Sequence, residues 1–273
     1  SSLIDMTITT NKFDSLLRQQ QRSWYISLTK PLTLLGVILV SFGTVGLFDG
    51  QRLSEGVPDL IGMVGEMLPP DFSRTPDWIK PLIDTIAMSI AGTGMAITLS
   101  LPLSLGAARN TTPHPVVYFL SRMILNIARA IPELILGILF VAAVGFGTLP
   151  GVLALGFHSI GMVGKFLAEA IEHTDNSPIE AAKSVGANHL QIIFHSILPQ
   201  IFPQIADLTF YRWEYNFRAS MVLGAVGAGG IGFEIIGALR LLKYEEVSAL
   251  LLVVLIMVTL VDSLSNYLRQ KFI

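Results

Sequence analysis

Cysteine is absent from all 273 residues, which excludes disulfide bonds, thiolate metal sites and cysteine nucleophiles. Charge is also scarce: charged residues make up 14% of the chain, against about 25% in an ordinary soluble domain. The formal net charge of −2 shows no bias toward nucleic acid as a partner. What the chain has instead is 52% hydrophobic residues, arranged in long blocks, and a mean hydropathy of +0.62. This composition predicts an all-α membrane protein.

The sequence motifs of several enzyme classes are lacking as well. There is no G-x-x-x-x-G-K-[ST], so the chain has no P-loop to hold ATP and magnesium. There is no G-x-S-x-G or H-E-x-x-H, and the histidines show no metal-ligand spacing. Gly227, Gly229 and Gly232 do spell G-x-G-x-x-G, but their apolar surroundings lack the preceding strand of a dinucleotide site. We therefore expect no enzyme activity, cofactor or metal site in this chain.

Six segments are apolar and long enough to be membrane spans, for which about 20 residues are needed. They are Leu32–Phe48, Ile83–Ala107, Val116–Val144, Val152–Ile171, Pro199–Ala219 and Val247–Leu268. The glycine-rich run Gly227–Gly232 follows the fifth span and predicts a bend with a short returning segment, because glycine at this density does not sustain a helix. An alternative count makes Ser220–Leu239 a seventh span.

The charges in the flanking segments favour six spans. Both ends of the chain are basic and are expected in the cytoplasm, whereas the acidic loop Asp49–Lys80 is expected outside; Arg240 and Lys243 run against this pattern. No signal-peptide cleavage site is evident, so the first span is expected to be retained. The predicted organisation is a cytoplasmic segment 1–30 (containing Lys12, Arg18 and Arg22), a first span 31–48, an extracytoplasmic loop 49–81 and a transmembrane core 82–273.

The segment between the fourth and fifth spans, 177–199, is too polar to cross a bilayer. Ser177 is a suitable N-cap, Pro178 suits the first helical position, and Glu180 can close a capping box with Ser177. The helix is expected to run to about Val185 and to stop at Gly186. A second run then leads into the fifth span.

This polar segment resembles the EAA loop of binding-protein-dependent ABC importer permeases, through Glu180-Ala181-Ala182, Gly186 and Leu198-Pro199. Ser196 departs from the pattern, which prefers isoleucine there. The resemblance implies a type I ABC importer fold, similar to methionine permeases, whose cytoplasmic coupling helix docks on an ATPase subunit. The coupling residues it implies are Pro178, Glu180, Ala181, Ala182, Ser184, Gly186, Ala187, Leu198 and Pro199. The simpler alternative is an amphipathic loop without a special role.

Three further blocks look like the phosphonate-type permeases: Arg129–Glu133, Tyr211–Arg218 and Val226–Gly232. This resemblance, from about Leu82 onward, implies a bacterial inner-membrane homodimer that imports phosphonate or a related phosphorus oxyanion. It also implies two ABC ATPase subunits, which bind ATP and magnesium, and an extracytoplasmic phosphonate-type binding protein. Membrane lipid surrounds such a protein, and nucleic acid has no part in it. The alternatives are another solute, such as methionine or phosphate, and an ion-driven transporter, which predicts paired broken helices in two repeats.

Two predicted spans carry polar stripes. Arg122, Asn126, Arg129 and Glu133 are spaced by four, three and four residues, which places them on one helical face; Asp207, Tyr211, Glu214 and Arg218 repeat this spacing, with Arg212 alongside. A charge at the bilayer centre costs about 2.5–3.5 kcal/mol, so these residues should face protein or water. They either pair and hold helices together or line an anion pathway, for which the candidates are Asn126, Arg129, Glu133, Tyr211, Arg212, Glu214 and Arg218. Gly227, Gly229, Gly230 and Gly232 are candidates for a hinge or gate, or for close helix packing.

Overall fold

The computed structural model describes residues 20, 27 and 29–272, and within them there are helices but no strands, as predicted. They form two units that divide between Val64 and Gly65. The first contains the apolar helix Thr29–Thr44 and most of α2, Gly50–Glu66. The first predicted span therefore ends in turns at 45–48 rather than continuing as helix, and the predicted outer loop is largely helical. Lys12, Arg18 and Arg22 of the predicted cytoplasmic segment lie outside the described residues.

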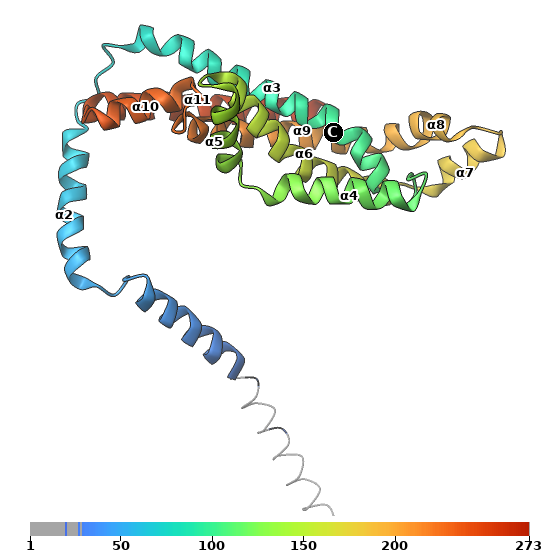
Figure 1. Ribbon diagram of the computed structural model, residues 1–273, viewed down its shortest axis with the longest axis horizontal. Coiled ribbons are helices and arrows are strands. Elements are labelled where there is room, and N and C mark those ends of the chain that lie inside the picture. The colour runs from blue at the N-terminus through green and yellow to red at the C-terminus, as the bar shows by residue number, and fades with distance from the viewer. Residues whose placement is uncertain (1–19, 21–26, 28, 273) are drawn as a thin grey trace, which may run out of the picture. The chain divides into compact units, whose positions relative to one another are not determined.

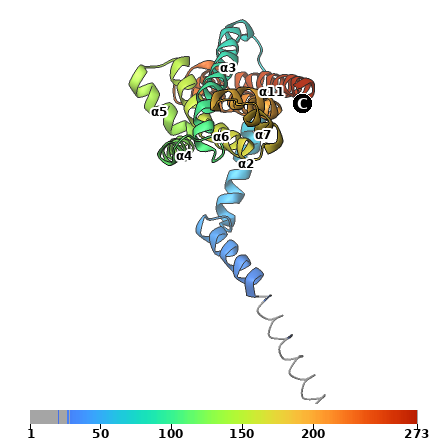
Figure 2. The ribbon, with the colours of Figure 1, turned by 90° about the vertical axis from the view of Figure 1, so that its right-hand side faces the viewer.

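In the second unit, α6 (Thr148–Glu172) is the central helix (Figures 1 and 2). It packs against four others: α3 (Thr75–Ala107), α4 (Pro115–Ala130), α5 (Glu133–Val144) and α9 (Leu198–Gly224). Figure 2 shows α4 and α5 on one side of this helix and α11 on the other. Glycine makes the close approach possible, because a Cβ on Gly161 would lie 2.5 Å from the Leu125 carbonyl oxygen of α4.

The predicted third span, Val116–Val144, is not one helix. It is divided into α4 and α5, which meet at an angle of 90°. Pro132 causes the break: it has no N–H to donate, and it forces the preceding residue out of the helical conformation. Ile131 is accordingly extended, with φ −91° and ψ 122°. The expectation that Glu133 shares a helical face with Arg122, Asn126 and Arg129 is therefore wrong.

The polar segment after α6 forms a short helix, α7 (Asn176–Ser184), followed by α8 (His189–Ile192). The predicted N-cap, Ser177, is wrong: Asp175 caps α7, and its Oδ1 accepts the Ser177 N–H at 2.9 Å. A carboxylate two residues upstream is the stronger acceptor, so it displaces the hydroxyl from this role. Gly186 ends the segment with φ +82°, as predicted. A π-helical turn, Ile193–Ile197, then joins α8 to α9.

Beyond α9 the chain turns and returns as α10 (Gly230–Arg240), followed by α11 (Tyr244–Phe272). The predicted glycine-rich bend is confirmed, because Gly227, Gly229 and Gly230 have φ of +99°, +75° and +72°. Ser220–Leu239 is divided between α9 and α10, so it does not form the single continuous helix that a straight seventh span would need.

Three described helices are long and apolar enough to cross a membrane by themselves: α3, α6 and α11. The bent pair α4 and α5 supplies a fourth span if it is counted as one. The helix Thr29–Thr44 is apolar but shorter, and α9 has 27 residues but carries several charges. These six segments overlap the six predicted spans, and the count of six stays a prediction.

Candidate functional site

One side of α7 is attached to the helical core and the other is free. Ile179, with 8% of its surface exposed, packs into an apolar cluster with Ala107, Ile171 and Ile192. Ser196, the departure from the EAA pattern, donates its hydroxyl to the Pro178 carbonyl oxygen at 3.2 Å. The segment 177–199, which we call the coupling segment after its predicted role, is therefore held to the end of α6 and the start of α9.

The free side of α7 carries the middle of the EAA motif. Glu180, Ala181 and Ser184 are exposed, and the Glu180 carboxylate has no hydrogen bond or ion pair with any described residue. Pro178 and Gly186 are exposed too, at the two ends, and Pro199 is exposed in the first turn of α9. The remaining motif residues pack inward against the apolar cluster: Ala182, Ala187 and Leu198. Some residues of the motif thus attach the segment to the helical core, and the others are exposed.

At its start, α7 is fixed by Asp175. The backbone N–H and the hydroxyl of Ser177 both donate to this carboxylate, at 2.9 and 3.0 Å. These hydrogen bonds lower the pKa of Asp175 below its usual value, because they stabilise the charged form.

The polar stripe of α9 faces α11. Asp207 and Glu214 both bind Arg269, at 3.0 and 3.2 Å, and Arg218 binds Asp262 at 2.5 Å. The interpretation that this stripe pairs and holds helices together therefore fits these three residues, although their partners are on the last helix rather than on α4. Tyr211, on the same stripe, is 46% exposed.

Arg212 points the other way, into the core, and only 2% of its surface is exposed. Its Nε donates to the Ser159 hydroxyl of α6 at 2.8 Å, and its guanidinium lies 4.1 Å from the centre of the Tyr215 ring. Asn216 extends the network by donating to Thr93 of α3 at 2.9 Å. One terminal nitrogen of Arg212 has no partner among the described residues. A buried guanidinium with an unused N–H can donate a hydrogen bond to a further polar or anionic group.

The break between α4 and α5 is also lined by polar groups. The Tyr215 hydroxyl lies 2.8 and 2.9 Å from the two carboxylate oxygens of Glu133, and His158 Nε2 lies 3.4 Å from one of them. The other ring nitrogen of His158 lies 3.1 Å from the Ile131 carbonyl oxygen, which the break removes from helical hydrogen bonding. Irregular backbone at membrane depth needs such partners.

Together, Glu133, His158, Ser159, Arg212 and Tyr215 form a connected set that we call the break cluster. The sequence predicted two of its members, Glu133 and Arg212, but missed His158, Ser159 and Tyr215. His158 stands out in an apolar segment, which was the available signal. The structure does not bring Asn126 or Arg129 into this cluster: both are exposed on α4, with no hydrogen bond to any described residue.

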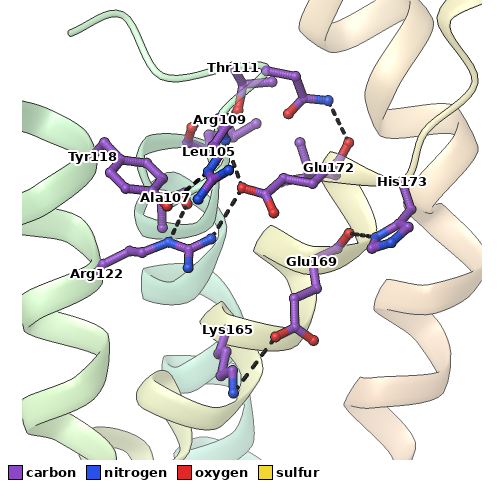
Figure 3. Close-up of polar contacts among 12 residues, drawn as sticks. Leu105, Ala107, Arg109, Thr111, Tyr118, Arg122, Lys165, Glu169, Glu172 and His173 are labelled. Atoms are coloured by element: carbon purple, nitrogen blue, oxygen red, sulfur yellow. Dashed lines mark hydrogen bonds and ion pairs between the residues drawn. The ribbon is translucent and has the colours of Figure 1, made fainter. Parts of the chain in front are cut away.

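A third polar group lies at the end of α6 that leads to α7 (Figure 3). Glu172 binds Arg122 of α4 at 3.1 Å, while Lys165 and Glu169 pair along α6 at 3.7 Å. Arg122 is therefore an inter-helix contact rather than a continuation of the break cluster. Within the described residues, no group of three or more His, Asp or Glu side chains could hold a metal ion.

Most of this core, residues 100–273, matches the family described as binding-protein-dependent transport system inner membrane component. The chain belongs to this family. It is 56% identical to the phosphite transport system permease protein PtxC of Stutzerimonas stutzeri, over 95% of this chain and 94% of that one. It is 38% identical to the phosphate-import permease protein PhnE of Mycolicibacterium smegmatis, over 87% of this chain and 44% of the relative. The predicted resemblance to phosphonate-type permeases is thereby confirmed.

Among solved structures, the fold is similar to a chain of the inward-facing MetNI methionine ABC transporter. The TM-score is 0.65 at 21% identity, and the match covers 74% of this chain and 99% of the other. The predicted methionine-permease-like fold is confirmed.

Proposed function

We propose that this permease imports phosphite, phosphonate or a related phosphorus oxyanion, using ATP hydrolysed by two partner subunits. The observation that carries the proposal is the 56% identity to a phosphite permease, which extends over 95% of the chain. D-methionine permeases such as that of Pasteurella multocida are more distant, at 29% identity over 70% of the chain. Methionine and inorganic phosphate remain the alternative cargoes to be tested.

The exposed side of α7 is the proposed docking site for the ATPase. The small Ala181 permits close approach to a groove, and the Glu180 carboxylate beside it is free to bind a group of the ATPase. Ile179 and Ser196 hold the opposite side to the core. A force applied to α7 by the ATPase would consequently reach α6 and α9.

The proposed pathway lies between two copies of the chain. Arg129 and Asn126 are exposed on a membrane-crossing helix and have no described partner, so in lipid they would be costly. A second copy related by a two-fold axis would cover this surface and could enclose water between the copies. Arginine suits an oxyanion because its planar donors match the geometry of phosphate-like groups. We assign Asn126, Arg129 and the partly exposed members of the break cluster, Glu133, His158 and Tyr215, to this pathway.

The proposed docking of an ATPase on α7 determines which end of the second unit faces the cytoplasm. Figure 1 shows α7 and α8 at one end of the second unit and α10 at the other. If α7 is cytoplasmic, the α10–α11 turn faces outward, where a cavity of about 530 Å³ is lined by Arg74, Lys243 and Glu246 among others. We propose that a binding protein docks at this end in the bacterial inner membrane, with both termini of the permease in the cytoplasm.

The test is reconstitution. The permease is co-expressed with its ABC ATPase and binding protein, inserted into proteoliposomes, and assayed for ATP hydrolysis and for uptake of labelled phosphite, a phosphonate, phosphate and methionine. We expect the liganded binding protein to stimulate hydrolysis, and uptake to favour a reduced phosphorus oxyanion. Uptake that needs an ion gradient but no ATPase would instead identify a secondary transporter.

Docking is tested separately with Glu180→Arg and Gly186→Glu, which should prevent assembly or leave hydrolysis without uptake. Glu55→Arg on α2 is the matched charge reversal and should behave as the wild type. Normal uptake by both α7 variants would refute the docking assignment.

A further inference from the structure

The last turn of α6 carries a carboxylate that joins three parts of the chain. Glu172 Oε1 accepts the backbone N–H of Arg109 at 2.9 Å and a guanidinium nitrogen of Arg122 at 3.1 Å. Arg109 lies in the turn between α3 and α4, and Arg122 lies in α4. Figure 3 shows these groups converging on one oxygen. Glu172 is only three residues before Asp175, the N-cap of α7.

The α3–α4 turn makes further hydrogen bonds as well. Arg122 Nε donates to the Ala107 carbonyl oxygen at 3.0 Å, which satisfies an acceptor that has no helical partner because α3 ends there. Asn110 donates to the Ile171 carbonyl oxygen at 2.7 Å, and His189 Nε2 of α8 lies 3.0 Å from the Thr111 carbonyl oxygen. The α3–α4 turn is therefore bonded to the helices on both sides of α7.

Glu169, one turn earlier on α6, makes no comparable connection. It pairs with Lys165 of the same helix at 3.7 Å, and both side chains are 46% exposed. The Glu172 carboxylate is only 23% exposed and its donors come from other segments. A contact within one helix cannot transmit motion to another, whereas a charge-assisted contact between segments can.

We propose that Glu172 is a positioning residue that locks the α3–α4 turn to the coupling segment, so that movement of α7 displaces α3 and α4. The proposal rests on the proposed function, in which an ATPase docks on α7. The route is continuous: α7 to Glu172, Glu172 to Arg122, and α4 onward to the break at Ile131. Without the carboxylate, the Asn110–Ile171 and His189–Thr111 contacts would remain, but α4 would lose its direct link to the end of α6 and would follow movement of α7 only in part.

The experiment measures uptake per ATP hydrolysed in the reconstituted importer. Glu172→Gln has nearly the same shape but lacks the charge that holds Arg122. We expect it to bind the ATPase and hydrolyse ATP normally, while uptake per ATP falls about fivefold or more, the lower end of ordinary coupling between sites. Glu169→Gln is the matched control and should keep the wild-type ratio. An unchanged ratio in Glu172→Gln would overturn the proposal.

A second measurement separates coupling from folding. Because the chain has no cysteine, two spin labels can be introduced at Val185→Cys, next to α7, and Pro113→Cys, in the α3–α4 turn. We expect a narrow distance distribution that is kept in all nucleotide states, and a broader one with Glu172→Gln. Equal distributions in both backgrounds would overturn the proposal even if uptake fell. Failure of the wild-type chain to couple to any ATPase would refute the proposed function instead.

Discussion

Gly232 of α10 offers a sharp test of how α9 and α10 are joined. A Cβ on Gly232 would overlap the Met221 carbonyl oxygen and lie 2.7 Å from the carbonyl carbon of the same residue. These are backbone atoms of α9, so no side-chain rotation can relieve the collision. Gly232→Ala must therefore push the two helices apart.

The expected cost follows from the geometry. Overpacking a well-packed contact costs about 1–3 kcal/mol, and at roughly 2–4 °C per kcal/mol the apparent Tm should fall by about 2–12 °C. Gly237→Ala is the matched control, because it lies in the same helix and a Cβ there would have no heavy atom within 4 Å. Alanine is the better helix former by about 1 kcal/mol, so this variant should be neutral or slightly stabilised.

The assay is the thermal loss of the monodisperse peak of the purified permease in nanodiscs, followed by size-exclusion chromatography. The reasoning is refuted if Gly232→Ala melts no earlier than Gly237→Ala. That result would mean that α9 and α10 separate readily at this point, as a hinge requires, whereas the expected result favours close packing.

Two further predictions concern charge. Arg218→Gln and Asp262→Asn should each lower the apparent Tm more than the double variant does, because a single substitution leaves one unpaired charge in the membrane at about 2.5–3.5 kcal/mol; additive losses would contradict this. The pKa of Asp175 is lowered by its hydrogen bonds to Ser177. The stability that the ionised carboxylate gives to α7 is therefore complete above the usual carboxyl pKa, and it is lost as the pH falls through the lowered pKa. Hydrogen exchange of α7, corrected for intrinsic rates, should accordingly be constant between about pH 7 and 5 and accelerate only below the ordinary aspartate pKa of 3.8, and Asp175→Asn should remove this acid dependence.

The features predicted correctly are those that local chemistry determines. Long apolar blocks become helices wherever no breaker intervenes, and Gly227–Gly232 must bend because several positive φ values are needed there. Gly186 ends α7 for the same reason. Each of these depends on a few neighbouring residues.

Two local predictions are wrong because two signals compete at each place. In the third apolar block, the length of the block favours one span, but Pro132 within it is the stronger signal and produces the 90° break. At the start of α7, the capping-box spacing to Glu180 favours Ser177 as N-cap, but Asp175 lies two residues earlier and takes this role.

The pairing of the polar stripes could not be predicted from the stripes alone. The spacing of Glu214 and Arg218 shows which helical face they share, but not which helix that face meets. The matching stripe on α11, with Asp262, Ser265 and Arg269, is present in the sequence. Only the tertiary arrangement selects α11 rather than α4 as the partner.

The glycine-rich turn also cannot be understood by itself, because it is bonded to another irregular segment. The Gly147 N–H, in the turn between α5 and α6, donates to the Gly227 carbonyl oxygen at 3.1 Å. A Cβ on Gly227 would collide with the Phe146 ring from the same turn. Through this hydrogen bond, each turn satisfies a backbone group of the other. A movement at Gly227 would therefore either carry the α5–α6 turn with it or break this hydrogen bond and the contact with Phe146.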